Sequence, residues 1–600
     1  MSLSYRPEID GFRALAVTTV VLFHAKIPGF ENGFIGVDIF FVISGFLITS
    51  IIAREQAGEG FSYGRFVMRR VRRILPALVV VMLACIPFAW WLMLPDPLEN
   101  FGQSLVATAF SANNILLWLT SGYWDLSSDF KPLLHTWSLG VEEQFYILYP
   151  MLLVLALRLP IRACYILMAA MAALSFWLMV RALQTDPAAA FYLLHYRAWQ
   201  LLIGGIAGLL AMRSGVGDRP GLAGLGLALV MGALVPLPGM PMAVTLALAT
   251  VGAAFYLLWA RSGSAVTWVF TRRPVIFVGL VSYSFYLWHQ PVFAFLRVGR
   301  LDHPTYLHFA AGILLAFALA VLSWRYVERP FRSARTTGNR TLWSFVGPGM
   351  IVPVALGLAL YLGKGYSQRL NYPPDTGEAG LTVAYNERIR RILPRDFSGD
   401  AGNKPVVLIA GNSFARDFSN VVLEAGLGDR LTLLYRDDLG ICSDNWTDKE
   451  REFVARLDML VFASGGYLND CLPSLIAATT PLELPVYMIG PKHFGNNLNP
   501  LVRYSPERRA ETRLKIPAPV QAINTRQIEQ LGDLYIDLIS VLSPDGRTIR
   551  VADSRGVLLT TDRVHLSRAG AVYVAEELPD LFPELYDLAG LSPAGAHSED

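Results

Sequence analysis

The amino-acid sequence predicts an α-helical polytopic membrane bundle of about ten helices plus one linking helix, followed by an α/β domain with a mostly parallel sheet. Of the 600 residues, 53% are hydrophobic and 16% are charged, which is too apolar for a soluble protein of this length. Apolar runs of membrane-spanning length recur as far as residue 362. From residue 405, short apolar strands alternate with helical patterns. We therefore expect a membrane domain over 1–335, a linking helix and linker over 336–403, and a globular domain over 404–600.

The net charge and the cysteines narrow the class of protein. A net charge of +3 gives no indication of a nucleic-acid partner. The first apolar run lacks a small-residue cleavage pattern and is followed directly by a second run, which favours a retained membrane helix over a signal peptide. Cys85 and Cys164 lie in apolar runs and are expected to be packing residues. Cys442 and Cys471 lie in the polar C-terminal part, where export from the cytosol would allow a disulfide.

The placement of arginines orders the apolar runs into a topology. The predicted crossings are 13–29, 34–53, 74–94, 144–160, 163–183, 197–213, 221–238, 242–260, 275–297, 305–327 and 343–362. The loop 54–73 holds six arginines and the segment 325–340 holds five, so both are expected to be cytoplasmic. An even number of crossings must join them, and a further, more polar run over 104–119 would make that number odd. We therefore expect 104–119 to be re-entrant, interfacial or packed inside the bundle, with the N-terminus cytoplasmic and the C-terminal domain periplasmic.

The first crossing carries two ionisable residues, Arg13 and His24. Ionisable side chains inside a membrane helix are costly, so each is a candidate for function. At the helical rise they lie roughly 16 Å apart, about half of a bilayer core. The alternative is structural: Arg13 reaches the lipid headgroups and His24 hydrogen-bonds a carbonyl group.

Two further groups of charges are candidates in the bundle. The basic cluster Arg69, Arg70, Arg72 and Arg73 suits a cytoplasmic anion site for a phosphorylated donor, or it only sets the topology. Glu142 and Glu143 are adjacent acids close to His135. Neighbours on a helix point about 100° apart, so at most one of the two faces the bundle interior. A carboxylate there would raise the basicity of an imidazole such as His24, while the alternative is a helix start at which the dipole favours acids.

Taken together, these motifs resemble the membrane acyltransferase-3 family. The resemblance covers about 1–335 and rests on Arg13 with His24, and on the segments 40–47, 69–73, 136–146 and 283–291. It implies a ten-helix bundle that passes an acyl group, usually acetyl, from cytoplasmic acyl-CoA to an acceptor on the outer side. It also implies catalytic roles for Arg13, His24 and one acid of the Glu142/Glu143 pair, and donor binding through the arginine cluster. Acetyl-CoA would then be a substrate, with no permanently bound cofactor and no metal. His289, which lies among aromatic residues in 283–291, is more typical of a packing residue.

The C-terminal pattern predicts a parallel sheet with a site at one edge. The expected strands are 405–410, 431–435, 457–463, 486–490 and 534–538. Ser413 follows the first strand at the turn into a helix, where ligands bind in such folds. Asp562 and His565, three residues apart before a helix, suit a base and the residue that orients it. The third strand runs into the candidate oxyanion donors Gly465, Gly466 and Asn469, which would act with the Ser413 amide. Taken singly, a serine at this position is usually a helix cap.

These blocks resemble the SGNH hydrolase and acyltransferase superfamily. The resemblance implies that Ser413 is the nucleophile and that Asp562 and His565 are its partners. Two positions depart from the pattern: Asn412 replaces the usual aspartate before the nucleophile, and Phe414 replaces the usual histidine after it. A glycine of the second block is not placed.

Exported fusions of these two domains resemble bacterial O-acetyltransferases of the inner membrane. The implied partners are acyl-CoA, membrane lipid and a lipid-linked or polymeric glycan. The opening residues 5–11 resemble the Gram-negative glycan branch, which favours a lipopolysaccharide O-antigen as acceptor over exopolysaccharide or peptidoglycan. The enzyme alternative is an esterase activity of the exported domain. The non-enzyme alternative is a glycan transporter with a binding domain, which would have no need of Ser413, Asp562 and His565.

Overall fold

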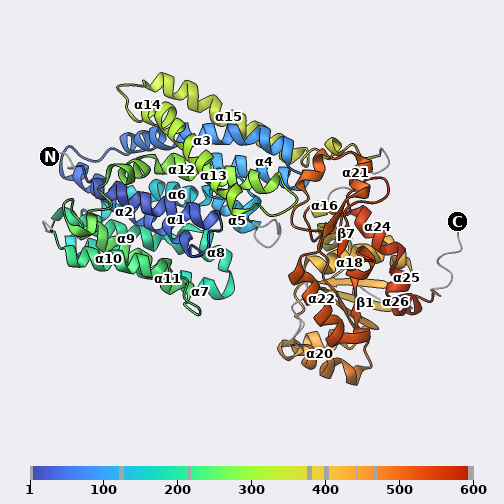
Figure 1. The fold of residues 1–600 in the computed structure, drawn as a ribbon. Helices are drawn as coiled ribbons and strands as arrows, with labels where there is room; N and C mark the ends of the chain where they lie inside the picture. Colours follow the sequence, from blue (N-terminus) through green and yellow to red (C-terminus); the bar gives the residue numbers. More distant parts are fainter. Residues whose placement is uncertain are drawn as a thin grey trace. The chain divides into compact units, whose positions relative to one another are not determined.

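The computed structural model describes residues 5–120, 128–213, 218–373, 382–397, 404–440, 442–463 and 471–591. The chain divides into two compact units. The first comprises Met1–Trp90, Asn100–Arg297 and Pro304–Leu362, and the second comprises Trp91–Glu99, Val298–His303 and Gly363–Asp600. Figure 1 draws the helices of the first unit and the sheet of the second.

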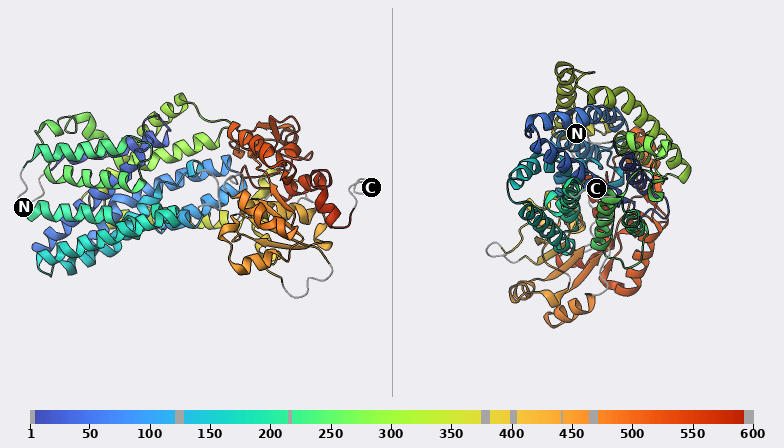
Figure 2. Two further views of the ribbon diagram at one scale, coloured as in Figure 1. Left: turned by 90° about the horizontal axis from the view of Figure 1, so that it is seen from below. Right: turned by 90° about the vertical axis from the view of Figure 1, so that its left-hand side faces the viewer.

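The first unit is a bundle of long helices. They are α1 (Pro7–His24), α2 (Gly36–Ala57), α3 (Tyr63–Leu92), α6 (Thr136–Ala156), α7 (Ile161–Thr185), α9 (Leu194–Arg213), α10 (Pro220–Leu234), α11 (Met242–Trp259), α12 (Arg273–Val298), α13 (Tyr306–Ser323) and α15 (Asn339–Leu362). Each predicted crossing coincides with one of these helices, and the views of Figure 2 show them running alongside one another. The predicted helical membrane bundle is therefore confirmed as a fold.

The bundle helices differ in their length and apolar composition. Seven stretches among the described residues are long and apolar enough to cross a membrane by length and composition alone. Of the other helices, α10 is apolar but shorter. The remaining three, α1, α9 and α12, carry Arg13, Arg197 and His289, respectively. The apolar helices α3 and α6 carry ionisable residues as well, Arg70 and Glu142, so helices of both kinds bring ionisable side chains into the bundle.

The polar run 104–119 does not form one long helix. It contains the end of α4 (Pro95–Ala109) and all of α5 (Asn113–Leu119), with Ser111 between them at a φ of 54°. Asn113 and Asn114 are fully buried, and their amides donate to the carbonyl oxygens of Leu133 and Tyr192, respectively. The expectation that this run packs inside the bundle fits these contacts, because the buried amides need partners there.

Helices α2 and α9 pack at very close range because glycines face the opposite backbone. A Cβ atom on Gly204 of α9 would lie 2.1 Å from the carbonyl oxygen of Val42 on α2. Beside this contact, Asp38 accepts hydrogen bonds from the buried Arg197 guanidinium at 2.7 Å and from Gln200 at 2.8 Å. Small residues and buried polar pairs are the means by which membrane helices associate.

The second unit is built on a five-stranded parallel sheet. Its strands are β1 (Val406–Gly411), β2 (Thr432–Arg436), β3 (Met459–Ala463), β4 (Val486–Ile489) and β6 (Tyr535–Ile536), in the order β2-β1-β3-β4-β6. They coincide with the five predicted strands, so the mostly parallel α/β fold is confirmed. A separate antiparallel pair joins β5 (Arg513–Lys515) to β7 (Thr548–Arg550).

Both faces of the sheet are covered, as a parallel sheet requires. Val407 and Ile409 of β1 pack into one apolar core, and Leu408 and Ala410 pack into another. Helices α18 (Ser413–Glu424) and α24 (Arg568–Glu576) pack against each other, and α18 also contacts β1 (Figure 1). The strand order reverses between β1 and β3, so the loops that follow these two strands flank the crevice where ligands bind in open α/β sheets.

Two short segments from distant parts of the sequence belong to this second unit. Leu94 lies in its apolar core, and the Leu94 amide donates to the Asn499 side chain at 2.9 Å. The Asn497 amide donates to the carbonyl oxygen of Val298 at 2.9 Å. Asp96 is buried and accepts hydrogen bonds from the Thr561 hydroxyl and, at 3.2 Å, from the Thr382 backbone amide. Thr561 immediately precedes Asp562, so the segment 91–99 supports the loop that carries a predicted site residue.

Candidate functional site

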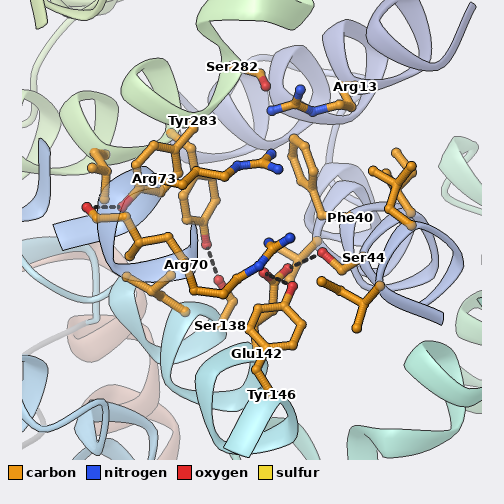
Figure 3. Close-up of a pocket in the computed structure, with 18 of the residues that line it drawn as sticks. Arg13, Phe40, Ser44, Arg70, Arg73, Ser138, Glu142, Tyr146, Ser282 and Tyr283 are labelled. Carbon is orange, nitrogen blue, oxygen red and sulfur yellow. Dashed lines mark hydrogen bonds between the residues drawn. The ribbon is translucent and has the colours of Figure 1, made fainter. Parts of the chain in front are cut away.

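The first unit contains a polar pocket between α1, α2, α3, α6 and α12 (Figure 3). The guanidinium groups of Arg13, Arg70 and Arg73 converge on the same space. Arg13 also contacts Asp10, one helical turn earlier, at 3.2 Å. Three cations around one pocket favour an anionic ligand, because guanidinium groups bind phosphate oxygens in pairs.

Glu142 is the acid of the pair that lines this pocket. Its carboxylate accepts hydrogen bonds from the Ser44 hydroxyl at 3.0 Å and from the Tyr146 hydroxyl at 2.9 Å (Figure 3). Glu143 is not among the lining residues. Of the two acids, Glu142 is thus the one placed at the pocket, and a catalytic role for either stays a prediction.

The arginine cluster on α3 divides into two pairs. Arg70 and Arg73 line the pocket. Arg69 instead forms an ion pair with Glu55 at 2.7 Å. Arg72 is buried and donates to the Thr337 carbonyl at 2.8 Å and to the Asn339 side chain at 2.7 Å. Two members of the predicted donor-binding cluster thus line the pocket, whereas the other two are held by partners outside it, and donor binding by all four stays a prediction.

His24 is the last residue of α1 and does not line the pocket. Its ring centroid lies 5.3 Å from that of His289 on α12. We expected a carboxylate beside His24. Glu142 does not supply it, because its carboxylate contacts Ser44 and Tyr146 instead. The reason is distance along the helix: eleven residues separate His24 from Arg13, roughly 16 Å of axis.

In the second unit, the structure brings Ser413, His565 and Asp562 together. The Ser413 hydroxyl lies 2.7 Å from His565 Nε2, and His565 Nδ1 lies 2.5 Å from Asp562 Oδ2. The other Asp562 oxygen accepts the backbone amides of Val564 and His565, both at 2.9 Å. Nucleophile, base and orienting carboxylate in this order form a Ser-His-Asp triad.

The turn after β1 fixes the position of Ser413. Gly411 has a φ of 130°, and a Cβ there would lie 2.2 Å from the carbonyl oxygen of Ala463 on β3. Asn412 caps α18 by accepting the Phe414 amide at 3.0 Å. The two departures from the superfamily pattern, Asn412 and Phe414, therefore leave the triad contacts in place.

The triad is electrostatically coupled. Burial alone would raise the pKa of Asp562, but the charge of His565 and three hydrogen bonds lower it to about 2. Burial alone would lower the pKa of His565, but the Asp562 carboxylate outweighs burial and raises the pKa above its usual 6.5. The imidazole is thus made a better base by the carboxylate that orients it.

Two residues that support the triad were missed by the sequence analysis. Asp417 accepts the Leu566 amide at 3.1 Å, next to His565, and contacts the buried Lys492 ammonium at 2.7 Å. Asp417 also accepts the Asn386 side-chain amide at 2.6 Å. Asp417 lies four residues after Ser413 on α18, so its helical spacing was the available signal. The pairing with Lys492 spans too much sequence for any local pattern.

The remaining candidates concern oxyanion donors and cysteines. Gly465, Gly466 and Asn469 lie outside the described residues, so their role stays a prediction. Cys442 and Cys471 are joined in the structure, with their Cα atoms 4.6 Å apart.

We expect this disulfide to be present in the folded protein. After denaturation without reductant, a thiol reagent should label only Cys85 and Cys164, which are not part of the disulfide. Prior reduction should add two further labelled thiols, located by peptide mass spectrometry. Labelling of all four cysteines before reduction would contradict the bridge.

Comparison with known proteins identifies the family. Residues 6–325 match the family model described as the acyltransferase domain, Acyl_transf_3. Because the match covers more than half of the chain, this protein belongs to the membrane acyltransferase-3 family, and it is a multi-pass membrane protein.

Relatives of named function share the same region. The chain is 29% identical over 351 residues to the peptidoglycan O-acetyltransferase OatA of Listeria monocytogenes, covering 55% of this chain and 56% of OatA. It is 30% identical over 365 residues to a Staphylococcus aureus protein named "Putative O-acetyltransferase", covering 55% and 58%. It is 28% identical over 351 residues to the "Putative peptidoglycan O-acetyltransferase YrhL" of Bacillus subtilis, covering 55% of each. The matches thus span little more than half of each relative. No solved structure matches the chain.

Proposed function

We propose that this protein transfers an acetyl group from acetyl-CoA, bound at the inner face of the membrane, to a hydroxyl of a glycan outside it. The observation that carries the proposal is the Ser413–His565–Asp562 triad in a chain whose first unit belongs to an acyltransferase family. The pocket with Arg13, Arg70 and Arg73 suits the phosphates of coenzyme A.

The chemistry of the triad is ordinary acyl transfer. Ser413 Oγ attacks the acyl carbonyl while His565 Nε2 takes its proton, and the departing group leaves with that proton. A glycan hydroxyl then attacks the Ser413 ester, passes its proton to His565, and leaves as the acetylated sugar. His565 returns the proton to Ser413 Oγ. Asp562 stays ionised throughout and holds the imidazole in place.

Peptidoglycan is the acceptor that the comparisons favour. Two of the relatives are named for peptidoglycan O-acetylation, and none of those described above is named for lipopolysaccharide. The expectation of an O-antigen acceptor, drawn from residues 5–11, therefore becomes the second candidate.

The proposal is tested by comparing cell-envelope glycans with and without the gene. Mass spectrometry of isolated peptidoglycan should show O-acetyl groups that disappear on deletion and return with the wild-type gene. Loss from lipopolysaccharide alone would move the acceptor to O-antigen. A gain of acetyl groups on deletion would identify an esterase. Unchanged acetylation, with lipid-linked glycan retained inside the cell, would identify a transporter.

The acid limb of the pH-rate profile should lie above pH 6.5. His565 must be neutral to accept the Ser413 proton, and its pKa is raised by Asp562, so activity is lost as the pH falls through that raised pKa. The measurement is kcat/KM against pH for full-length protein with an acetyl ester. In Asp562→Asn the lost charge should slow the reaction and move the acid limb to lower pH. An acid limb below pH 6.5 in the wild type would show that another group governs the rate.

A further inference from the structure

Three histidines from distant parts of the sequence meet inside the bundle. The His289 ring centroid lies 5.3 Å from that of His24 and 5.6 Å from that of His135. His135 and His289 are almost fully buried, whereas His24 is only partly buried. The cluster therefore has one partly exposed member and two buried members.

Several ring nitrogens of this cluster are buried without a hydrogen-bond partner among the described residues. His24 Nδ1, His289 Nε2 and both nitrogens of His135 are buried without a hydrogen-bond partner in the part of the chain that the structure describes. Buried polar atoms without partners are costly and are found most often where function requires them. His24 Nδ1 and His289 Nε2 do not form a hydrogen bond in the structure, but with the ring centroids 5.3 Å apart a change in ring orientation would bring the two atoms within hydrogen-bond distance.

The tautomer of His289 follows from its one strong contact. His289 Nδ1 lies 2.6 Å from the carbonyl oxygen of Tyr286, which can only accept, so Nδ1 carries a hydrogen. In the neutral ring, Nε2 then has a free lone pair. This is the arrangement of a base whose orientation is fixed by a backbone carbonyl.

The same residues connect the cluster to the arginine-lined pocket. Tyr286 lines the pocket, and its hydroxyl contacts the Ser138 hydroxyl at 2.7 Å. The Tyr286 ring packs against both His135 and His289, with centroids 5.4 Å and 5.3 Å away. Tyr286 thus contacts the pocket with its hydroxyl and two histidines of the cluster with its ring.

We propose that His289 positions His24 and accepts a proton from it during acyl transfer in the bundle, an inference that rests on the proposed function. As a hydroxyl attacks the thioester carbon, the C–O bond forms, the C–S bond breaks, and the electron pair leaves on the thiolate of coenzyme A. His24 takes the hydroxyl proton at Nε2 and releases its Nδ1 proton to His289 Nε2. The reverse transfer through His24 delivers one proton to the thiolate, so the pair of histidines ends unchanged.

Two substitutions of His289 separate this role from a structural one. In His289→Asn, the amide can still donate to the Tyr286 carbonyl as Nδ1 does, but no base remains. In His289→Gln, the amide reaches the Nε2 position but cannot accept a proton. A relay predicts that both variants lose about 100-fold or more in kcat while KM for acetyl-CoA is unchanged. A structural role predicts that His289→Asn stays within twofold of wild type.

The measurement uses full-length protein in nanodiscs and follows coenzyme A thiol release, with water and with glycan as acceptors. The matched control is His195→Asn, because His195 is an exposed histidine on α9 and should leave the rate unchanged. If His289→Asn does not fold, the test uses His289→Ala with free imidazole added to the assay. Restored release of the coenzyme A thiol would support the relay, and no restoration would overturn it. Failure of wild type to acetylate glycan would refute the proposed function, whereas the ratio of variant to wild-type thiol release tests only the relay.

Discussion

Replacing Ser413 with alanine is expected to abolish glycan acetylation, with a loss on the order of 10⁴-fold or more in kcat. The Ser413 hydroxyl lies 2.7 Å from His565 Nε2, and among the residues that the structure describes no other hydroxyl hydrogen-bonds to that nitrogen. Without the Ser413 hydroxyl no serine ester can form. The acyl group then either stays on the group that carries it or is lost by hydrolysis. The measurement is O-acetyl content of peptidoglycan in cells that carry the variant, normalised to the amount of protein in the membrane.

Ser419→Ala is the matched control for this variant. Ser419 lies on the same helix, α18, is fully buried, and donates only to the Ala415 carbonyl at 2.8 Å. It should retain wild-type acetylation. Full acetylation by Ser413→Ala would show that the second unit only positions the acceptor.

Replacing His24 with alanine is expected to abolish acetylation although the Ser413 triad remains intact. General acid–base catalysis typically contributes about 10²- to 10⁴-fold, and His24 is the partly buried member of the histidine cluster. The informative measurement is the acetylation state of the peptide that contains Ser413, trapped by rapid acid quenching. Wild type should carry some acetyl-Ser413, and His24→Ala should carry none.

The matched control for His24→Ala is His195→Ala, because His195 is an exposed histidine on α9. Both proteins should be present in the membrane at wild-type amounts. Normal acetylation by a correctly inserted His24→Ala would remove the end of α1 from the chemistry and leave the pocket as a binding site alone.

The fold could be predicted from the sequence because a local sequence pattern indicates each helix and strand. Apolar runs of fixed length predict membrane helices, and five short apolar runs separated by helical patterns predict the parallel sheet. The triad could be predicted for a related reason: Ser413 ends a strand, and Asp562 and His565 lie three residues apart, so topology brings them to one edge.

The bundle site could be predicted only in part, because its contacts join distant helices. Helical spacing could not separate Arg70 and Arg73 from Arg69 and Arg72, since Arg69 and Arg73 are themselves i,i+4 neighbours on one face of the helix. No local pattern pairs Asp38 with Arg197, or His24 with His289. His289 looked like a packing residue because its neighbours in sequence are aromatic, whereas its neighbours in space include two imidazoles.

The inclusion of Trp91–Glu99 and Val298–His303 in the second unit has a practical consequence for anyone who wishes to excise it. A soluble fragment cut after α15 would leave Asn497, Asn499 and Thr561 without the backbone and carboxylate partners they have in the intact chain. Such a fragment would have a hole in its hydrophobic interior where Leu94 belongs. The hydrolytic activity measured for this fragment would then be that of a damaged protein. A fragment that also contains the two missing peptides, joined through short linkers, would keep these contacts.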